Sequence, residues 1–318
     1  MGCNTSIKVL PAPLTKNAPV YLNESWENVF QCRGNGKDTD VVDEVRLLKV
    51  LHVRSASCPR SATVKIWDNT VGNIPKEDSS TAELSRQVRV DVERTFLEES
   101  KDATNTNLAD FRNELGRILE AHRKEFPLAV YVQGQHCIVS FFLHRGARAH
   151  ALFTRIIKTL KLGVVFLDGF PGMQILANSI EIYFSTAKKR GILQGLKRNG
   201  LSVFIVLSRW IPTLYLSAGL CTSSAEMVYS LILTSRSSAQ AGKVLLLIGI
   251  YLLECSNADD PNSSTSSIFQ FLNKEGKSID FGRVASIAEN LSSSAVLSRF
   301  CDDWNQAVDL PLAPAREQ

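Results

Sequence analysis

The sequence predicts an all-α protein, and three observations support this. Apolar residues recur every three or four positions in several segments, which is the spacing of one face of a helix. Strand-like alternation of apolar and polar residues is scarce, and no internal repeat is present. Hydrophobic residues make up 44 % of the 318 residues, which is enough to bury a sizeable core.

Residues 1 to about 40 are expected to form a tail and linker that carries a lipid signal. The chain starts Met1-Gly2-Cys3, with Ser6 at the position that N-myristoylation of Gly2 favours. Cys3 lies where a second, palmitoyl chain could be attached. One acyl chain holds a protein to a membrane only marginally, whereas two anchor it stably. The sequence therefore predicts a cytoplasmic protein held by lipid at the cytosolic face of a membrane.

The helical pattern begins near Asp43. The segment Thr81–Phe96 has one apolar stripe, because its hydrophobic residues recur every four positions. A loop is expected before it, over residues 71–80. Asp110 is expected to cap the next helix, whose buried face extends from Phe111 to Phe126 and which Pro127 ends. A further helical run is expected to carry Ile138 to Phe142.

Apolar segments of helical length continue from about residue 150 to 255. Val244–Leu253 is too short to span a bilayer, and Leu201–Leu220 contains Arg209 and Pro212, so both are expected to be buried helices. A polar loop is expected over residues 257–267. Two last helices are expected, one including Ile268–Leu272 and one near Ile287–Trp304.

Composition argues against several classes of function. The formal net charge is only +4, and nucleic-acid binding usually needs more basic residues on one face. The seven cysteines include no C-x-x-C pair, so reduced thiols in the cytosol are expected. His144 and His150 lack partners at metal-ligand spacing, which predicts no metal site. His136 and Cys137 would diverge by about 100° on a helix, which disfavours a nucleophile–base pair.

One segment places an arginine on the outside of a helix. In Val88-x-x-Asp91-x-x-Arg94, the apolar stripe faces inward and Arg94 points about 140° away from it, toward solvent. Asp91 lies one turn earlier, so its carboxylate is within reach of the guanidinium. On this segment alone, a routine surface ion pair is the favoured interpretation.

A second segment, Tyr131-Val132-Gln133-Gly134, lies between two predicted helices. Gln133 is expected at the start of the second helix, and Gly134 would let another backbone segment come close. This segment alone also indicates little, because glutamine is common at helix starts.

Together, V-x-x-D-x-x-R and Y-V-Q-G resemble the paired signatures of TBC domains, I-x-x-D-x-x-R and Y-x-Q. TBC domains are helical GTPase-activating domains that act on Rab-type GTPases. The resemblance covers residues 45–310 and implies a multi-helix domain in two helical subdomains. The first half, about 45–150, carries both motifs; the second is about 151–310, and residues 311–318 form a tail.

The resemblance implies that the chain is not itself an enzyme but supplies Arg94 and Gln133 in trans to a Rab-type small GTPase. Asp91 would steady Arg94, and Tyr131 would shape the loop that carries Gln133. No cofactor is expected, because GTP and magnesium would belong to the partner GTPase; the sequence has no P-loop of its own.

Two departures keep an alternative open. Thr63 stands four residues before Trp67, where the family commonly has the arginine of R-x-x-x-W. Gln135-His136 follows Gly134, where the family often has Met-Asn. The alternative is a TBC-like scaffold that binds a small GTPase or another trafficking partner with weak catalysis. A basic cluster is a candidate for contact with acidic lipid or with an acidic GTPase surface, although such clusters are more often solvated helix faces. Its members are Lys188, Lys189, Arg190, Lys197 and Arg198.

Overall fold

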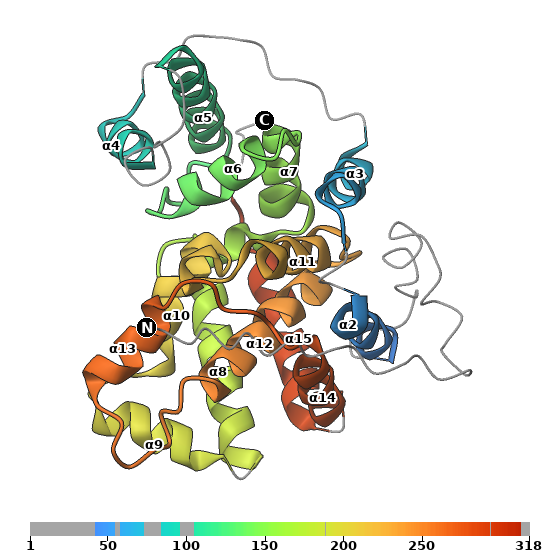
Figure 1. Cartoon of the computed structure of the whole chain (residues 1–318), viewed down its shortest axis with the longest axis vertical. Helices are drawn as coiled ribbons and strands as arrows, with labels where there is room; N and C mark the ends of the chain where they lie inside the picture. The colour runs from blue at the N-terminus through green and yellow to red at the C-terminus, as the bar shows by residue number, and fades with distance from the viewer. Residues whose placement is uncertain are drawn as a thin grey trace, which may run out of the picture.

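The helices fall into two groups, which lie one above the other in Figure 1. The computed structural model describes residues 42–54, 58–72, 84–95, 105–187, 189–292 and 294–312. Within these ranges the chain is helical, and its only β-type pairings are two isolated bridges. The predicted all-α class is therefore confirmed.

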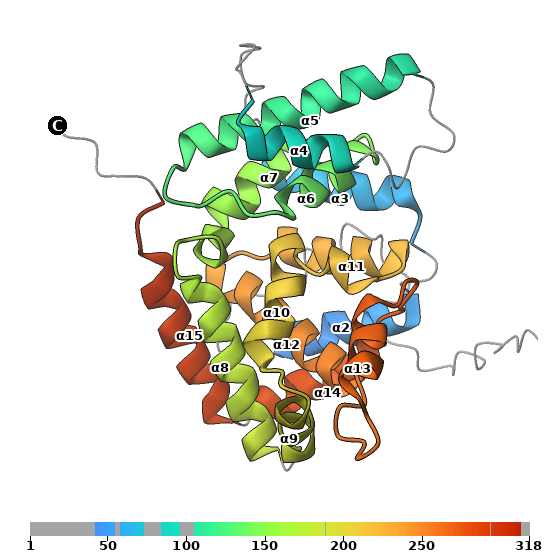
Figure 2. The same cartoon turned by 90° about the vertical axis from the view of Figure 1, so that its left-hand side faces the viewer.

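The upper group carries the two sequence motifs (Figures 1 and 2). Its helices are α3 (Arg60–Val71), α4 (Arg86–Thr95), α5 (Asn105–Glu125), α6 (Gln135–Leu143) and α7 (Ala149–Thr154), and a π-helical turn, η4 (Arg155–Thr159), continues α7. Helix α6 lies at the centre, where it packs against α4, α5 and α7. Its position in the middle of the group fixes the loop that precedes it.

Helix α4 is held on α5 by apolar packing and by one buried carboxylate. Val88 and Val92 are buried, which confirms the inward stripe. Leu84 packs over Gly116 of α5, where an added Cβ would lie 2.8 Å from Leu84 Cδ1. The Glu120 carboxylate accepts a hydrogen bond from the Ser85 amide at 3.2 Å. The helix begins at Arg86, later than predicted, and residues 81–83 and 96 lie outside the described ranges.

The predicted cap of α5 is wrong. The helix starts at Asn105, and Asp110 lies inside it with its side chain exposed. An exposed aspartate in a helix interior costs little, so its preference for caps does not decide where the helix begins. The helix ends at Glu125, two residues before Pro127, so the predicted end at this proline is confirmed.

The lower group is built around α12 (Ser238–Glu254), whose residues 244–253 are all buried, as predicted. Around it lie α8 (Pro171–Thr186), α9 (Arg190–Arg198), α10 (Val203–Trp210), α11 (Thr222–Leu233), α13 (Thr265–Asn273), α14 (Phe281–Ser292) and α15 (Ala295–Val308). A 3₁₀ turn, η5 (Leu162–Val165), joins the two groups, and two more, η6 (Ile211–Thr213) and η7 (Leu216–Ala218), follow α10.

The first described helix, α2 (Val42–Arg54), belongs in space to the lower group. It packs against α14, far along the sequence. Lys49 Nζ lies 2.6 Å from Glu289 Oε1, and His52 Nδ1 lies 3.0 Å from Asp280 Oδ1. The chain therefore enters the upper group from below and returns to the lower group after α7.

Two helical segments are shorter than predicted. The segment near Ile287–Trp304 is two helices, α14 and α15, because consecutive serines favour a break and Ser294 takes an extended N-cap conformation. The segment Leu201–Leu220 stops being α-helical at Trp210. Pro212 follows in η6, since proline cannot continue the α-helical hydrogen bonds. None of the described helices is both long and apolar enough to cross a membrane.

Trp67 links the two groups. Its side chain is fully buried, and its Nε1 donates a hydrogen bond to Ser230 Oγ of α11 at 2.8 Å. Thr63, one turn earlier, is also fully buried, with its hydroxyl 3.5 Å from Cys58 Sγ. The tryptophan therefore has a packing role, and the threonine fits a buried position that would not accommodate a free charge.

Candidate functional site

Arg94 lies in the last turn of α4 with its side chain exposed, as predicted. In the part of the chain that the structure describes, no carboxylate is paired with its guanidinium. The arginine is therefore available to an anionic group on another molecule. Its five N–H donors form a fixed fork that matches phosphate oxygens.

Asp91 does not hold Arg94 directly. Its side chain is buried, 3 % exposed, and points into the protein, whereas Arg94 faces solvent. The Tyr131 hydroxyl donates a hydrogen bond to Asp91 Oδ2 at 3.1 Å. Burial, followed by the charge of Asp91, raises the pKa of the Tyr131 hydroxyl well above its usual range, so it remains a donor. The bond joins the two sequence motifs: Arg94 follows Asp91 by one turn, and Gln133 follows Tyr131 by two residues.

Gln133 lies at the end of the segment 126–134, which we call the glutamine loop. Gln133 is exposed and lies in a turn just before α6 rather than in the helix. The start of the loop is tied to distant segments: the Leu128 amide donates to the Leu312 carbonyl at 3.2 Å, and Ala129 forms a bridge with Leu167. The chain near its C-terminus therefore helps to position the loop.

Gly134 fits the end of the glutamine loop closely against η6. Its φ is +121°, which side chains with a Cβ rarely adopt. A Cβ here would lie 2.9 Å from Thr213 Cγ2 and 3.0 Å from the Pro212 carbonyl oxygen. The close approach predicted for Gly134 is therefore present, and η6 forms the surface on which the residue after Gln133 rests.

His136 contacts the glutamine loop, and the sequence analysis does not predict this contact. Its Nδ1 accepts a hydrogen bond from the Gly134 amide at 3.3 Å and lies 3.8 Å from Asp91 Oδ2. Its Nε2 lies 3.3 Å from Cys137 Sγ, so the prediction that these neighbouring side chains diverge is wrong. The 100° between adjacent residues on a helix describes where the side chains leave the backbone, and their rotamers can still bring the polar atoms together. The available signal was a histidine two residues after Gly134.

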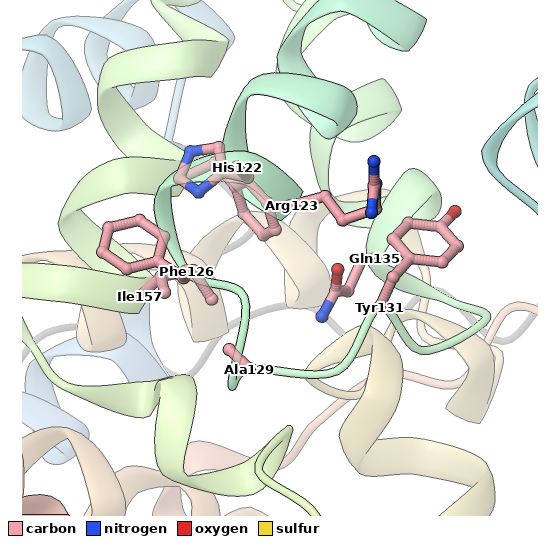
Figure 3. A pocket seen from close by; sticks show the side chains of 8 residues that line it. His122, Arg123, Phe126, Ala129, Tyr131, Gln135 and Ile157 are labelled. Atoms are coloured by element: carbon pink, nitrogen blue, oxygen red, sulfur yellow. The ribbon is translucent and has the colours of Figure 1, made fainter. Parts of the chain in front are cut away.

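A small cavity of about 10 Å³, room for about one water molecule, lies beneath the glutamine loop (Figure 3). Tyr131, Gln135 and Arg123 line one side of it, and His122 and Phe126 line the other. Burial, with a contribution from His150, lowers the pKa of His122 to about 3, so this histidine is neutral. The Gln135 side-chain amide donates to the Val130 carbonyl at 3.4 Å and so ties the middle of the glutamine loop to the first residue of α6.

The described residues outside the loop supply little other chemistry. They contain no cluster of three or more metal-ligating side chains. No disulfide joins any two of the described cysteines, which are Cys58, Cys137, Cys221, Cys255 and Cys301. In the basic cluster, Lys189 pairs with the buried Glu254, and Arg198 donates to the Asp260 carbonyl; Lys188 lies outside the described residues. Lys189 and Arg198 of that cluster therefore make contacts within the protein.

A model of the Rab-GTPase-TBC domain family matches residues 53–259, which is most of the chain and includes α4, the glutamine loop and α6. The protein therefore belongs to the Rab-GTPase-TBC domain family. Among solved structures, it is similar to the crystal structure of the Ypt/Rab-GAP domain of Gyp1p, with a TM-score of 0.52 and 13 % sequence identity. The match covers 84 % of this chain and 92 % of that one, and it shows a shared fold. No curated protein matches the sequence.

Proposed function

We propose that this protein is a GTPase-activating protein for a Rab-type small GTPase. Arg94 and Gln133 are the residues that enter the partner's active site, and neither side chain is buried in this chain. The proposal rests on the family, and one contact supports it above others. The Tyr131–Asp91 hydrogen bond fixes the turn that carries Arg94 beside the loop that carries Gln133.

The two side chains supply what slow GTP hydrolysis lacks. Charge develops on the phosphate oxygens as the γ-phosphoryl group is transferred, and a permanently protonated guanidinium stabilises it. The attacking water must also be aligned with the γ-phosphorus. In our proposal Arg94 neutralises the developing charge, and Gln133 orients the water in place of the GTPase's own glutamine. GTP and its magnesium ion are bound by the GTPase.

Removal of the Tyr131 hydroxyl is expected to weaken both the fold and the proposed activity. Tyr131→Phe would leave the Asp91 carboxylate buried without this donor, which costs about 1–3 kcal/mol of unfolding free energy. Urea denaturation of Tyr131→Phe, Asp91→Ala and the double variant measures the coupling between the two residues. If the hydrogen bond stabilises the fold, the double variant loses less unfolding free energy than the sum of the two single losses. Strictly additive losses would show that the two residues do not act together.

We further propose that myristoyl and palmitoyl chains on Gly2 and Cys3 hold the protein on the cytosolic face of a membrane. Both residues lie outside the described part of the structure, so the proposal rests on the sequence Met1-Gly2-Cys3 with Ser6. Sharing a surface with a membrane-attached GTPase would raise the effective concentration of each for the other.

Gly2→Ala is expected to move the protein from the membrane fraction to the soluble fraction of cells. The substitution removes the myristoyl acceptor, and a single remaining acyl chain anchors only marginally. Cys3→Ser is expected to weaken retention while leaving myristate incorporation intact. Fractionation of cells labelled with a myristate analogue measures both effects. Unchanged partitioning of Gly2→Ala would rule out the proposed anchor.

A further inference from the structure

The contacts of His136 connect the two halves of the candidate site. The imidazole is buried, 8 % exposed, between the glutamine loop and α4. Nδ1 accepts a hydrogen bond from the Gly134 amide, with 3.3 Å between the two nitrogens. Because Nδ1 is the acceptor, it carries no proton in this arrangement. The neutral ring then carries its proton on Nε2, which faces Cys137 Sγ at 3.3 Å. The geometry thus selects one neutral tautomer of His136.

We propose that His136 is a positioning residue that holds the glutamine loop only while its imidazole is neutral. The residue whose amide it accepts, Gly134, directly follows Gln133. A second proton on the ring would occupy Nδ1 and place two N–H donors against each other. The loop would lose the contact that fixes its last residue, and activation of the GTPase would fall on acidification. This inference rests on the function proposed above.

A competing acceptor is already in place for the protonated ring. Asp91 Oδ2 lies 3.8 Å from Nδ1, slightly beyond hydrogen-bond distance. A positively charged imidazole would be drawn toward this carboxylate, away from the Gly134 amide. The same oxygen accepts the Tyr131 hydroxyl, so the shift would also disturb the bond between the motifs. Protonation would exchange a contact that supports Gln133 for one that supports only α4.

Groups on the neighbouring elements affect the protonation equilibrium of the His136 ring. Helix α4 presents Asp91, which favours the charged ring, and the glutamine loop presents Tyr131, whose hydroxyl is neutral. Helix α6 presents the Cys137 thiol, and η6 presents the uncharged Thr213 against Gly134. On α5, the Arg123 guanidinium lines the cavity beside Tyr131 but is paired with Glu120. Histidine is the side chain that ordinarily changes charge between about pH 5 and 8.

The test compares His136→Asn with His136→Ala. The asparagine Oδ1 can accept a hydrogen bond from the Gly134 amide, and the asparagine side chain does not titrate. Alanine offers no acceptor. We expect His136→Ala to lose about tenfold or more of the GTPase acceleration at pH 8, since small misplacements of catalytic groups are costly. His136→Asn should retain most of it. Between pH 8 and about pH 5.5, acceleration by wild type should fall relative to His136→Asn.

His52→Asn is the matched control, because it removes an exposed histidine of α2 that pairs with Asp280. It should follow the wild-type pH profile. Each acceleration is divided by the rate of the GTPase alone at the same pH. Equal pH profiles for wild type and His136→Asn, or full activity of His136→Ala, would overturn the proposal.

A second measurement does not depend on GTPase activity. In ¹⁵N-glycine-labelled protein, the Gly134 amide resonance should titrate together with the His136 ring in wild type and should not titrate in His136→Asn. A Gly134 amide chemical shift that stays constant while His136 ionises would overturn the inference. If no GTPase is accelerated at any pH while Gly134 titrates as expected, the proposed function fails but the positioning contact stands.

Discussion

Replacement of Arg94 by alanine is expected to abolish nearly all acceleration of GTP hydrolysis by this protein. An arginine supplied in trans contributes about 10³–10⁵-fold to turnover, because it stabilises charge that develops only in the transition state. The Arg94 side chain is exposed at the end of α4, so its loss should leave the fold intact. Single-turnover hydrolysis of GTP on the partner measures the effect, and a thermal melt checks folding.

Two further variants sharpen the Arg94 prediction. Arg94→Lys should also fail, because an ammonium group cannot bridge two phosphate oxygens as the guanidinium fork does. Arg89→Ala is the control, since it removes an exposed guanidinium from the same helix, about 140° away around its axis. Arg89→Ala should retain activity. Retained activity in Arg94→Lys would indicate that a simple positive charge is sufficient.

Replacement of Gln133 by alanine is expected to lower the acceleration about 10²-fold or more, because the attacking water would lose its alignment. The expected loss is in the chemical step rather than in binding, since one exposed side chain is a small part of an interface. Hydrolysis under single-turnover conditions, together with affinity for the GTP-bound GTPase, separates the two. Gln194→Ala, an exposed glutamine of α9 at the far end of the molecule, is the control.

A GTPase lacking its own catalytic glutamine gives a stricter test of Gln133. If Gln133 orients the water, wild-type activator should still accelerate a GTPase whose glutamine is replaced by leucine. Gln133→Ala should not. Loss of acceleration with the altered GTPase would mean that the water is oriented by the partner, and that Gln133 has another role.

The sequence predicted the fold class well, because helical periodicity needs only local information. The stripe of α4 and the buried run of α12 were both visible as spacing of apolar residues. Helix ends were predicted less well. The sequence predicts Asp110 as a cap, but it lies within α5, and Ser294 divides a segment that the apolar pattern predicts as one helix. Ends depend on competing interactions with distant parts of the chain, which periodicity does not report.

The functional roles of the candidate site residues stay a prediction, and the sequence did not predict how these residues contact one another. Spacing alone placed Asp91 within reach of Arg94, yet a buried carboxylate needs a buried donor, and Tyr131 provides it from a segment far along the chain. The support from His136 was likewise missed, because its contact with the Gly134 amide depends on the positive φ of Gly134 and on the side-chain rotamer of His136. Both contacts depend on how the glutamine loop packs against α4, which the sequence does not specify locally.

The most direct test of the account is GTP hydrolysis by a panel of Rab-type GTPases with wild-type protein, Arg94→Ala and Gln133→Ala. The account predicts that wild type accelerates at least one GTPase by orders of magnitude and that each variant loses most of that acceleration. A GTPase that binds without acceleration would identify the protein as a TBC-like scaffold. Full acceleration by both variants would contradict the account, because the catalytic groups would then lie elsewhere.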